Sequence, residues 1–313
     1  MKLSRHQKAL LAVTLCTIIW SVAAPLFKWS MQTTPPATLL FFRFLLATLI
    51  MLPFVWKKIE IKFEDFYKIF LLAVTGITFN IGLFYLGLSL TQSINAPIIN
   101  STMPVFLMIG SILFLRQIPK PKAIVGTIIS LIGVLIIIFR PVDHLSLLEM
   151  ITGNLYFILA VISISFYTLF LKWLKPPYRS TTLVFWMFFI ATITFFPFFV
   201  HEAKITHSVA HLDLRGWIGI LYGAIFSSIL AQSFYNYSVR QLNTTEVGLF
   251  TYLGPVVTAL VAIPLLQEQI TFGYLLGVVF VFLGLFIAEI KFRYHPFHHH
   301  LTDIEDSTLE SNT

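Results

Sequence analysis

Long apolar runs separated by short polar segments repeat along almost the whole chain. Runs of about 20 mostly apolar residues are long enough to cross a hydrocarbon core as a helix. The predicted spans are 9–27, 37–56, 69–90, 96–115, 123–139, 153–171, 183–200, 216–239, 247–266 and 271–288. Each must be helical, because an isolated strand in lipid leaves its backbone polar groups unpaired. The pattern predicts an all-α polytopic membrane protein with ten transmembrane helices.

Charge changes this picture by giving the predicted helices an orientation. The chain is 57% hydrophobic and only 11% charged, with a net charge of +7. Sixteen lysines and arginines lie on the side that holds both termini, whereas the opposite side receives Lys28, Arg140, Lys204 and Arg215. Because basic loops stay in the cytoplasm, we expect cytoplasmic termini and, in a bacterium, the inner membrane. The charge is thus no sign of a nucleic-acid partner.

The two ends of the chain differ from the apolar runs between them. Residues 291–313 predict a disordered cytoplasmic tail. Lys2, Arg5 and Lys8 before the first apolar run imitate a secretory signal. The apolar run continues past the small residues at 21–23, so we expect no cleavage there.

The chain contains two copies of one five-helix unit, at 9–139 and 151–290. Lys28 and Pro53 recur 144 residues later as Lys172 and Pro197, and Pro104, Gly126 and Gly133 recur 151 residues later as Pro255, Gly277 and Gly284. Five is odd, so the second copy enters the membrane from the opposite side and the copies are inverted repeats. This arrangement is typical of secondary transporters, whose substrate site lies near the midplane between the halves.

These features resemble the EamA-type members of the drug/metabolite transporter superfamily, which have two five-helix domains. The resemblance is carried by FFRFLLATLIMLP at 41–53, INSTMPVF at 99–106, FTYLGPVV at 250–257 and the closing segments 115–137 and 266–288. It covers about residues 10–289 and implies a transporter, in most characterised relatives an exporter. The acidic residue that the family carries after the fourth helix is Glu268 in the second half, but the first half has Gln117. Arg43 likewise has Met187 at its repeat position, so the two halves need not act alike.

Arg43 stands among phenylalanines in the second predicted span, about 9 Å below the membrane surface at a rise of 1.5 Å per residue. No carboxylate lies in the middle of any predicted span to pair with it. The side chain either snorkels to the headgroups or bonds carbonyls of a neighbouring helix, or it faces a wet cavity and binds an anionic substrate group. The sequence leaves both interpretations open.

Other polar side chains follow helical faces. Ser228, Gln232 and Asn236 are spaced i, i+4, i+8 with Tyr235 alongside, and Asn80 lies on a similar line in the first half. Amides are unsatisfied in lipid, so these lines predict a shared cavity, although interhelical hydrogen bonding explains any single residue equally well. The candidate substrate-binding residues are Trp20, Arg43, Asn80, Tyr85, Asn100, Tyr167, Gln232, Tyr235, Asn236 and Thr251.

Two prolines are candidate hinges. Pro104 and Pro255 are predicted to lie within the fourth helix of each half, where a missing backbone donor kinks a helix. Gly126 with Gly133 and Gly277 with Gly284 are spaced i, i+7, which permits close helix approach. We interpret these glycines as structural.

The leading hypothesis is a secondary transporter, by resemblance an exporter, of small metabolites such as amino acids or related zwitterions or anions. The alternative is a multidrug or lipid transporter of the same fold, although Arg43 would repel a cationic cargo. A membrane-embedded enzyme is less favoured, because it needs catalytic groups at one depth and no His, Asp or Glu is central in a predicted span.

The predicted partners are a small-molecule substrate and the lipid bilayer, and a homodimer is left open. No cofactor is predicted. His207 and His211 have helical spacing near Glu202 and Asp213, but they fall short of a full zinc ligand set, so no metal site is predicted.

Overall fold

The computed structural model describes residues 4–115, 121–139, 146–174, 177–206, 212–242, 247, 250 and 253–289, and no β-strand occurs among them. The first-half helices are α1 (Arg5–Ser30), α2 (Pro36–Val55), η1 (Trp56–Lys58), η2 (Phe63–Asp65), α3 (Phe66–Ala73), η3 (Val74–Phe79), α4 (Asn80–Leu90), α5 (Asn95–Asn100), α6 (Met103–Leu115) and α7 (Pro121–Phe139). The second-half helices are α8 (Leu147–Leu174), α9 (Ser180–Thr206), α10 (Leu214–Leu221), η4 (Tyr222–Leu230), α11 (Ala231–Gln241), α13 (Gly254–Leu266) and α14 (Phe272–Glu289).

Most predicted spans fall on helical residues, with ends displaced by a few positions, but span 96–115 is interrupted by a turn at residues 101–102. Six continuous helical segments of the described chain are long and apolar enough to cross a membrane, and Ile124–Phe139, Gly254–Leu266 and Phe272–Ala288 are shorter apolar helices. Span 247–266 is described at 247, at 250 and from 253 onward. Residues 291–313 lie outside the described part, so the predicted tail stays a prediction.

Apolar side chains are exposed on the outside while polar side chains are buried inside. Leu260 is 70% exposed and Phe286 65%, whereas Arg43, Gln232 and Asn236 are buried. Extended apolar surface of this kind is rare on soluble monomers, but it suits contact with lipid tails. The chain is therefore an all-helical polytopic membrane protein.

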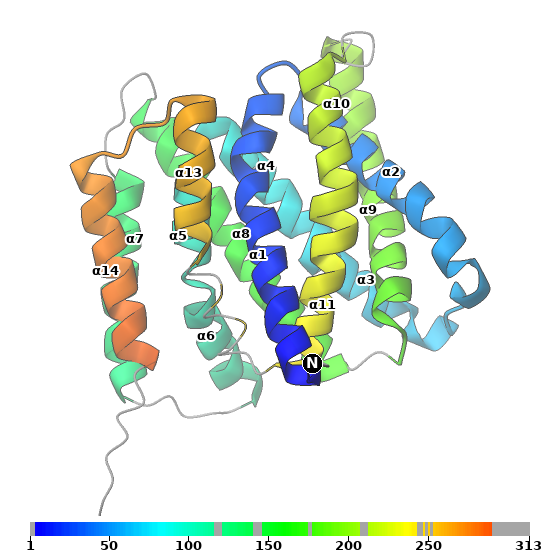
Figure 1. Cartoon of the computed structure of the whole chain (residues 1–313), viewed down its shortest axis with the longest axis horizontal. Helices are drawn as coiled ribbons and strands as arrows, with labels where there is room; N and C mark the ends of the chain where they lie inside the picture. The colour runs from blue at the N-terminus through cyan, green and yellow to red at the C-terminus, as the bar shows by residue number, and fades with distance from the viewer. Residues whose placement is uncertain are drawn as a thin grey trace, which may run out of the picture.

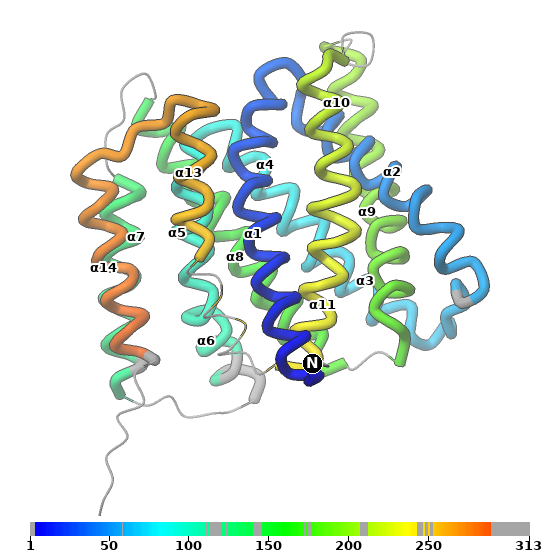
Figure 2. The backbone as a smooth tube through the Cα atoms, viewed as in Figure 1, coloured from blue at the N-terminus to red at the C-terminus, as the bar shows by residue number. Residues whose placement is uncertain are grey.

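The two central helices pack crosswise. The first-half helix α1 lies between α11 and α13 of the second half (Figure 2), whereas the second-half helix α8 packs against α4 and α6 of the first half. In the repeat, α1 corresponds to α8, α4 to α11 and α6 to α13. Each central helix thus contacts the same two elements of the opposite half, which brings residues of both halves to the middle of the molecule.

The ends of the molecule are formed by pairs of corresponding helices. The pair α7 and α14 lies at one end (Figure 1), where Gly126 approaches the backbone of Gly284 and Gly133 approaches that of Gly277. The predicted close approach of these glycines is confirmed. On the other side α2 packs against α9, with the hydroxyl oxygens of Thr48 and Thr192 3.5 Å apart.

The third long helix of each half contains a π-helical segment. The segment η3 lies between α3 and α4, and η4 lies between α10 and α11. Such wide turns inside α-helices are frequent at functional sites. In η3 the turn brings the backbone of Gly76 so close to Tyr167 that a Cβ there would lie 2.8 Å from the ring carbon Cγ.

The two candidate hinge prolines lie at helix starts rather than inside continuous helices. The α5 helix ends at Asn100 and Pro104 falls in the first turn of α6, while Pro255 falls in the first turn of α13. A helix tolerates proline in its first turn because the N–H at that position has no partner in the helix. The expected position is thus corrected, and the hinge role stays a prediction.

Candidate functional site

A cavity of about 140 Å³ lies between the two halves of the protein. First-half residues of α1, α2, α4, α5 and α6 line it, together with second-half residues of α8, η4, α11 and α13 and with Val247. A site for one water molecule needs only about 10–15 Å³ on this scale. The cavity therefore has room for a small organic molecule.

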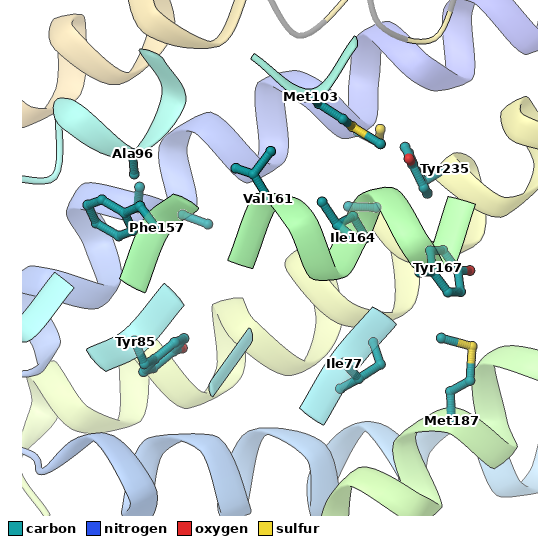
Figure 3. Packing of buried hydrophobic residues seen from close by; sticks show 14 of the residues in the cluster. Ile77, Tyr85, Ala96, Met103, Phe157, Val161, Ile164, Tyr167, Met187 and Tyr235 are labelled. Carbon is teal, nitrogen blue, oxygen red and sulfur yellow. The ribbon is translucent and has the colours of Figure 1, made fainter. Parts of the chain in front are cut away.

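Most of the cavity wall is apolar and aromatic. One face of α1 contributes Cys16, Trp20 and Phe27, and α8 contributes Phe157, Val161 and Ile164 at helical spacing. Figure 3 shows Phe157, Val161 and Ile164 in sequence along α8, with Tyr235 on the neighbouring yellow helix α11. Such a wall, carrying a few placed polar groups, is typical of a small-molecule site.

Arg43 lies in this wall and points into the protein. It is 2% exposed. Its Nε donates to Ser228 Oγ at 2.8 Å, one terminal nitrogen donates to Ser227 Oγ at 3.1 Å, and the other donates to Tyr85 OH at 3.3 Å. These inward contacts contradict the snorkelling interpretation and show hydroxyl partners in place of backbone carbonyls.

The charge of Arg43 meets no carboxylate among the described residues around it. Its guanidinium carbon lies 4.9 Å from the ring centroids of both Phe27 and Phe44. Three of its five N–H groups bond to neutral hydroxyls. A buried cation without an opposite charge is costly, so an anionic group in the cavity would be favoured beside it.

A neutral hydrogen-bond network lies behind the wall near α11. The Tyr167 hydroxyl donates to Asn236 Oδ1 and accepts from Gln232 Nε2 at 3.2 Å. Gln232 Nε2 also donates to Asn236 Oδ1 at 3.1 Å, and the Tyr235 hydroxyl lies 2.8 Å from Thr168 Oγ1. The network fixes the Gln232 amide at the cavity wall.

Two further polar side chains of the cavity wall form hydrogen bonds between the two halves. Trp20 Nε1 donates to the carbonyl of Ser227 at 3.0 Å, and Asn80 Nδ2 donates to the carbonyl of Ala160 at 2.8 Å. Asn100 also lines the cavity, and its amide makes no side-chain hydrogen bond with the described residues. It is therefore a wall amide left available to a ligand.

The structure brings most sequence-predicted site residues together. Six candidates line the cavity: Trp20, Arg43, Asn80, Asn100, Gln232 and Tyr235. Tyr85, Tyr167 and Asn236 lie behind the wall as hydrogen-bond partners of lining residues. Thr251 lies outside the described residues.

Sequence reasoning missed Ser227 and Phe27. Ser227 precedes Ser228, which lies on the predicted polar line, yet both hydroxyls accept from Arg43. Both serines belong to the π-helical segment η4, which the hydropathy pattern does not reveal. Phe27 carried no signal of its own among 32 phenylalanines.

A charged cluster follows the lining residue Phe27 along α1 and lies outside the cavity wall. This Lys28–Glu268 cluster consists of Lys28, Thr91, Ser93, Ile94 and Glu268. Lys28 Nζ donates to the Thr91 carbonyl at 2.7 Å and to Glu268 Oε1 at 3.1 Å, and Glu268 accepts from the backbone N–H groups of Ser93 at 2.7 Å and Ile94 at 3.0 Å. The cluster joins the end of α1 to the α4–α5 turn and to the α13–α14 connection.

Metal-ligating side chains do not gather within the described chain. No group of three His, Cys, Asp or Glu residues there is placed to hold a metal ion. His207 and His211 lie outside the described residues. Asp213 instead caps α10, accepting from the backbone N–H of Gly216 at 2.9 Å, a bond that holds the pKa of this carboxyl below its ordinary value.

Curated relatives match most of the chain. An uncharacterized transporter of Archaeoglobus fulgidus is 24% identical over 91% of this chain and 99% of its own length. The uncharacterized transporter YetK of Bacillus subtilis is 28% identical over 80% of this chain and 77% of its own length. These relatives are transporters by name, and their names state no substrate.

A solved structure and a family model also match most of the chain. One crystal structure superposes with a TM-score of 0.64 over 91% of this chain and 98% of the other at 14% identity, which shows a shared fold. The model of the EamA-like transporter family matches residues 7–139 and again residues 151–289. The chain therefore belongs to the EamA-like transporter family and is a membrane transporter.

Proposed function

We propose that this protein is a secondary transporter that exports small metabolites, amino acids or related zwitterions or anions, by alternating access between its two halves. The observation that carries the proposal is Arg43, a buried cation with neutral described partners in the wall of a cavity shared by both halves. A carboxylate would supply the missing charge and accept the two remaining N–H groups.

Crosswise contacts between corresponding residues support two inverted repeats of five helices. Gly126 meets Gly284 while their repeat mates, Gly277 and Gly133, meet each other, and Thr48 meets its own mate Thr192. A twofold relation between two copies of one unit produces such pairs. Rocking of the copies about a shared cavity would expose the substrate to each side in turn.

Orientation and direction are part of the same proposal. The excess of basic residues on the side of the termini supports cytoplasmic termini in a bacterial inner membrane. Export is proposed from the resemblance to characterised exporters. Uptake into inside-out vesicles would test it.

The decisive experiment compares wild type with Arg43→Met in detergent. Methionine occupies the repeat position of Arg43 and keeps an unbranched side chain without charge. Thermal shifts would be measured with amino acids, organic acids, nucleosides and cationic dyes. We expect a carboxylate compound to stabilise the wild type and to bind Arg43→Met at least tenfold more weakly, since a hydrogen bond to a charged group contributes about 1.5–3 kcal/mol.

Arg43→Lys is the matched control. Lysine keeps the charge but loses the bidentate fork, so intermediate binding is expected. Equal thermal shifts in wild type and Arg43→Met would contradict the proposal.

A multidrug or lipid transporter is the second candidate, favoured by the apolar and aromatic wall of the cavity. In that case hydrophobic cations or lipid-like compounds alone would stabilise the protein, and Arg43→Met would not weaken the effect.

A further inference from the structure

We infer that the substrate of the Arg43 cavity is a small amphipathic monoanion, in which one carboxylate is joined to an apolar body that carries no ammonium group. This inference rests on the proposed function and narrows it. It excludes α-amino acids from the preferred cargo while keeping the same binding site.

The charge of the cavity wall favours an anionic ligand. Arg43 is the one lining residue among those described that is charged at neutral pH. Cys16 and Tyr235 also line the cavity, but a thiol and a phenol are mainly neutral at neutral pH. The described wall thus offers one positive charge and no negative charge.

A carboxylate bound to Arg43 determines where an ammonium group of the same ligand would lie. In an α-amino acid the ammonium nitrogen is bonded to the carbon next to the carboxylate. A carboxylate on Arg43 would therefore hold the ammonium group close to the guanidinium, where like charges repel. The neighbouring rings of Phe27 and Phe44 already face the guanidinium.

The hydrogen-bond acceptors that the described wall could offer an ammonium group are all uncharged. Ser227, Ser228 and Tyr85 already accept from Arg43. The wall hydroxyls of Ser21 and Thr258 donate to backbone carbonyls, and wall amides carry no charge. An ammonium group would lose its hydration without meeting an opposite charge, which is unfavourable in a buried site.

The remainder of the cavity wall is mainly apolar and aromatic. The rings of Trp20 and Tyr235 have centroids 5.2 Å apart, and those of Phe84 and Phe157 are 5.6 Å apart. Val161 and Ile164 complete this surface on α8 (Figure 3). The volume of about 140 Å³ has room for a body such as a single ring or a short alkyl chain.

The test uses two matched sets of probes. The first set is 3-phenylpropionate, phenylalanine and 2-phenylethylamine, and the second is hexanoate, norleucine and pentylamine. Within each set the body is constant while the carboxylate or the ammonium group is added or removed. Dissociation constants would be measured by calorimetry on the full-length protein in detergent.

We expect the two acids to bind wild type at least tenfold more tightly than the matching amino acids, with no detectable binding of the amines. Arg43→Met should lose the acids. If that variant does not fold, Arg43→Lys should still bind them, more weakly than wild type.

Asn100→Asp tests the charge argument in the opposite direction. Asn100 makes no side-chain hydrogen bond with described residues, so the exchange adds a negative charge without removing a described contact. The affinity of phenylalanine relative to 3-phenylpropionate should rise at least tenfold. An unchanged ratio would overturn the inference.

The remaining outcomes separate the inference from the proposed function. If the amino acids bind as tightly as the acids and Arg43→Met abolishes this binding, the inference is overturned while the proposed function stands. Measurable and equal binding of the acids to wild type and Arg43→Met would overturn both. Failure of all six probes to bind would overturn the inference.

Discussion

At the scale of single residues, the cavity depends on side chains that never reach its surface. Tyr167 is fully buried and joins Gln232 to Asn236 through one hydroxyl. Burial of Gln232 Nε2 and of Asn236 Oδ1 is tolerated because they bond to each other and to the tyrosine, whereas Asn236 Nδ2 has no hydrogen-bond partner among the described residues. The position of the lining Gln232 amide is thus set by a residue behind it.

Tyr167→Phe should destabilise the protein. The change removes the donor to Asn236 and the acceptor for Gln232, and unsatisfied buried groups cost about 1–3 kcal/mol. The melting temperature in detergent should fall by several degrees. Tyr156→Phe, on the same helix, is the control, because the Tyr156 hydroxyl makes no hydrogen bond with described residues. Equal melting temperatures for the two variants would show that the network contributes nothing to stability.

At the scale of elements, sequence pattern was a good guide to where helices lie and a poor guide to their internal form. Hydropathy located the predicted spans because lipid requires long apolar helices. It did not reveal the π-helical segments η3 and η4 or the interruption between α5 and α6. These features depend on packing, such as that of Gly76 against Tyr167.

The contact between α7 and α14 gives a prediction for one glycine pair. A Cβ at Gly126 would lie 2.5 Å from the Ala288 backbone nitrogen, so Gly126→Ala must push the helices apart. Overpacking of this kind costs about 1–3 kcal/mol, and we expect a lower melting temperature.

Gly82→Ala is the matched control, because its nearest atom would be Phe195 Cε1 at 3.4 Å. There the better helix propensity of alanine, up to about 1 kcal/mol, should leave stability unchanged or raised. Glycine-to-alanine substitution is thus expected to lower the melting temperature at Gly126 and to leave it unchanged or raise it at Gly82. An equal fall in melting temperature at both sites would contradict the packing argument.

At the scale of the whole molecule, the Lys28–Glu268 cluster ties segments of both halves together next to the lining residue Phe27. Lys28 directly follows the lining residue Phe27, and its side chain is 26% exposed while that of Glu268 is 5% exposed. Their repeat mates are Lys172 and Gln117, so the corresponding position in the other half lacks the acid. The sequence thus allows an ion pair between Lys28 and Glu268, but not between their repeat mates Lys172 and Gln117.

Because the Lys28–Glu268 pair joins the two halves, we expect Glu268→Gln to loosen them and to expose the cavity more often. Cys16, the single cysteine of the chain, is buried and lines the cavity, so its alkylation by N-ethylmaleimide reports opening. Loss of about 1.4 kcal/mol from the closed state would raise the labelling rate about tenfold.

Asp213→Asn, which alters a charged cap away from the cavity wall, should label at the wild-type rate. The comparison is made well below the melting temperature of each variant. A Glu268→Gln rate equal to that of wild type would show that the cluster does not hold the cavity closed.

The candidate site could be predicted in part. Trp20, Arg43, Asn80, Asn100, Gln232 and Tyr235 were identified because polar or amphipathic groups in a lipid environment need protein or water around them. The partners of Arg43 could not be identified in the same way. Ser228 lies 185 residues along the chain from Arg43, and no spacing rule connects positions so far apart.

The sequence by itself determined the membrane environment, the helical class and the twofold recurrence, because each follows from the composition and order of residues along the chain. The tertiary structure decided which candidates share one cavity, that Arg43 bonds neutral hydroxyls, and that Lys28 meets Glu268. Those outcomes depend on how each helix is rotated about its axis and on the wide turns in η3 and η4. Rotation and wide turns arise from packing between distant segments, which hydropathy along the chain does not encode.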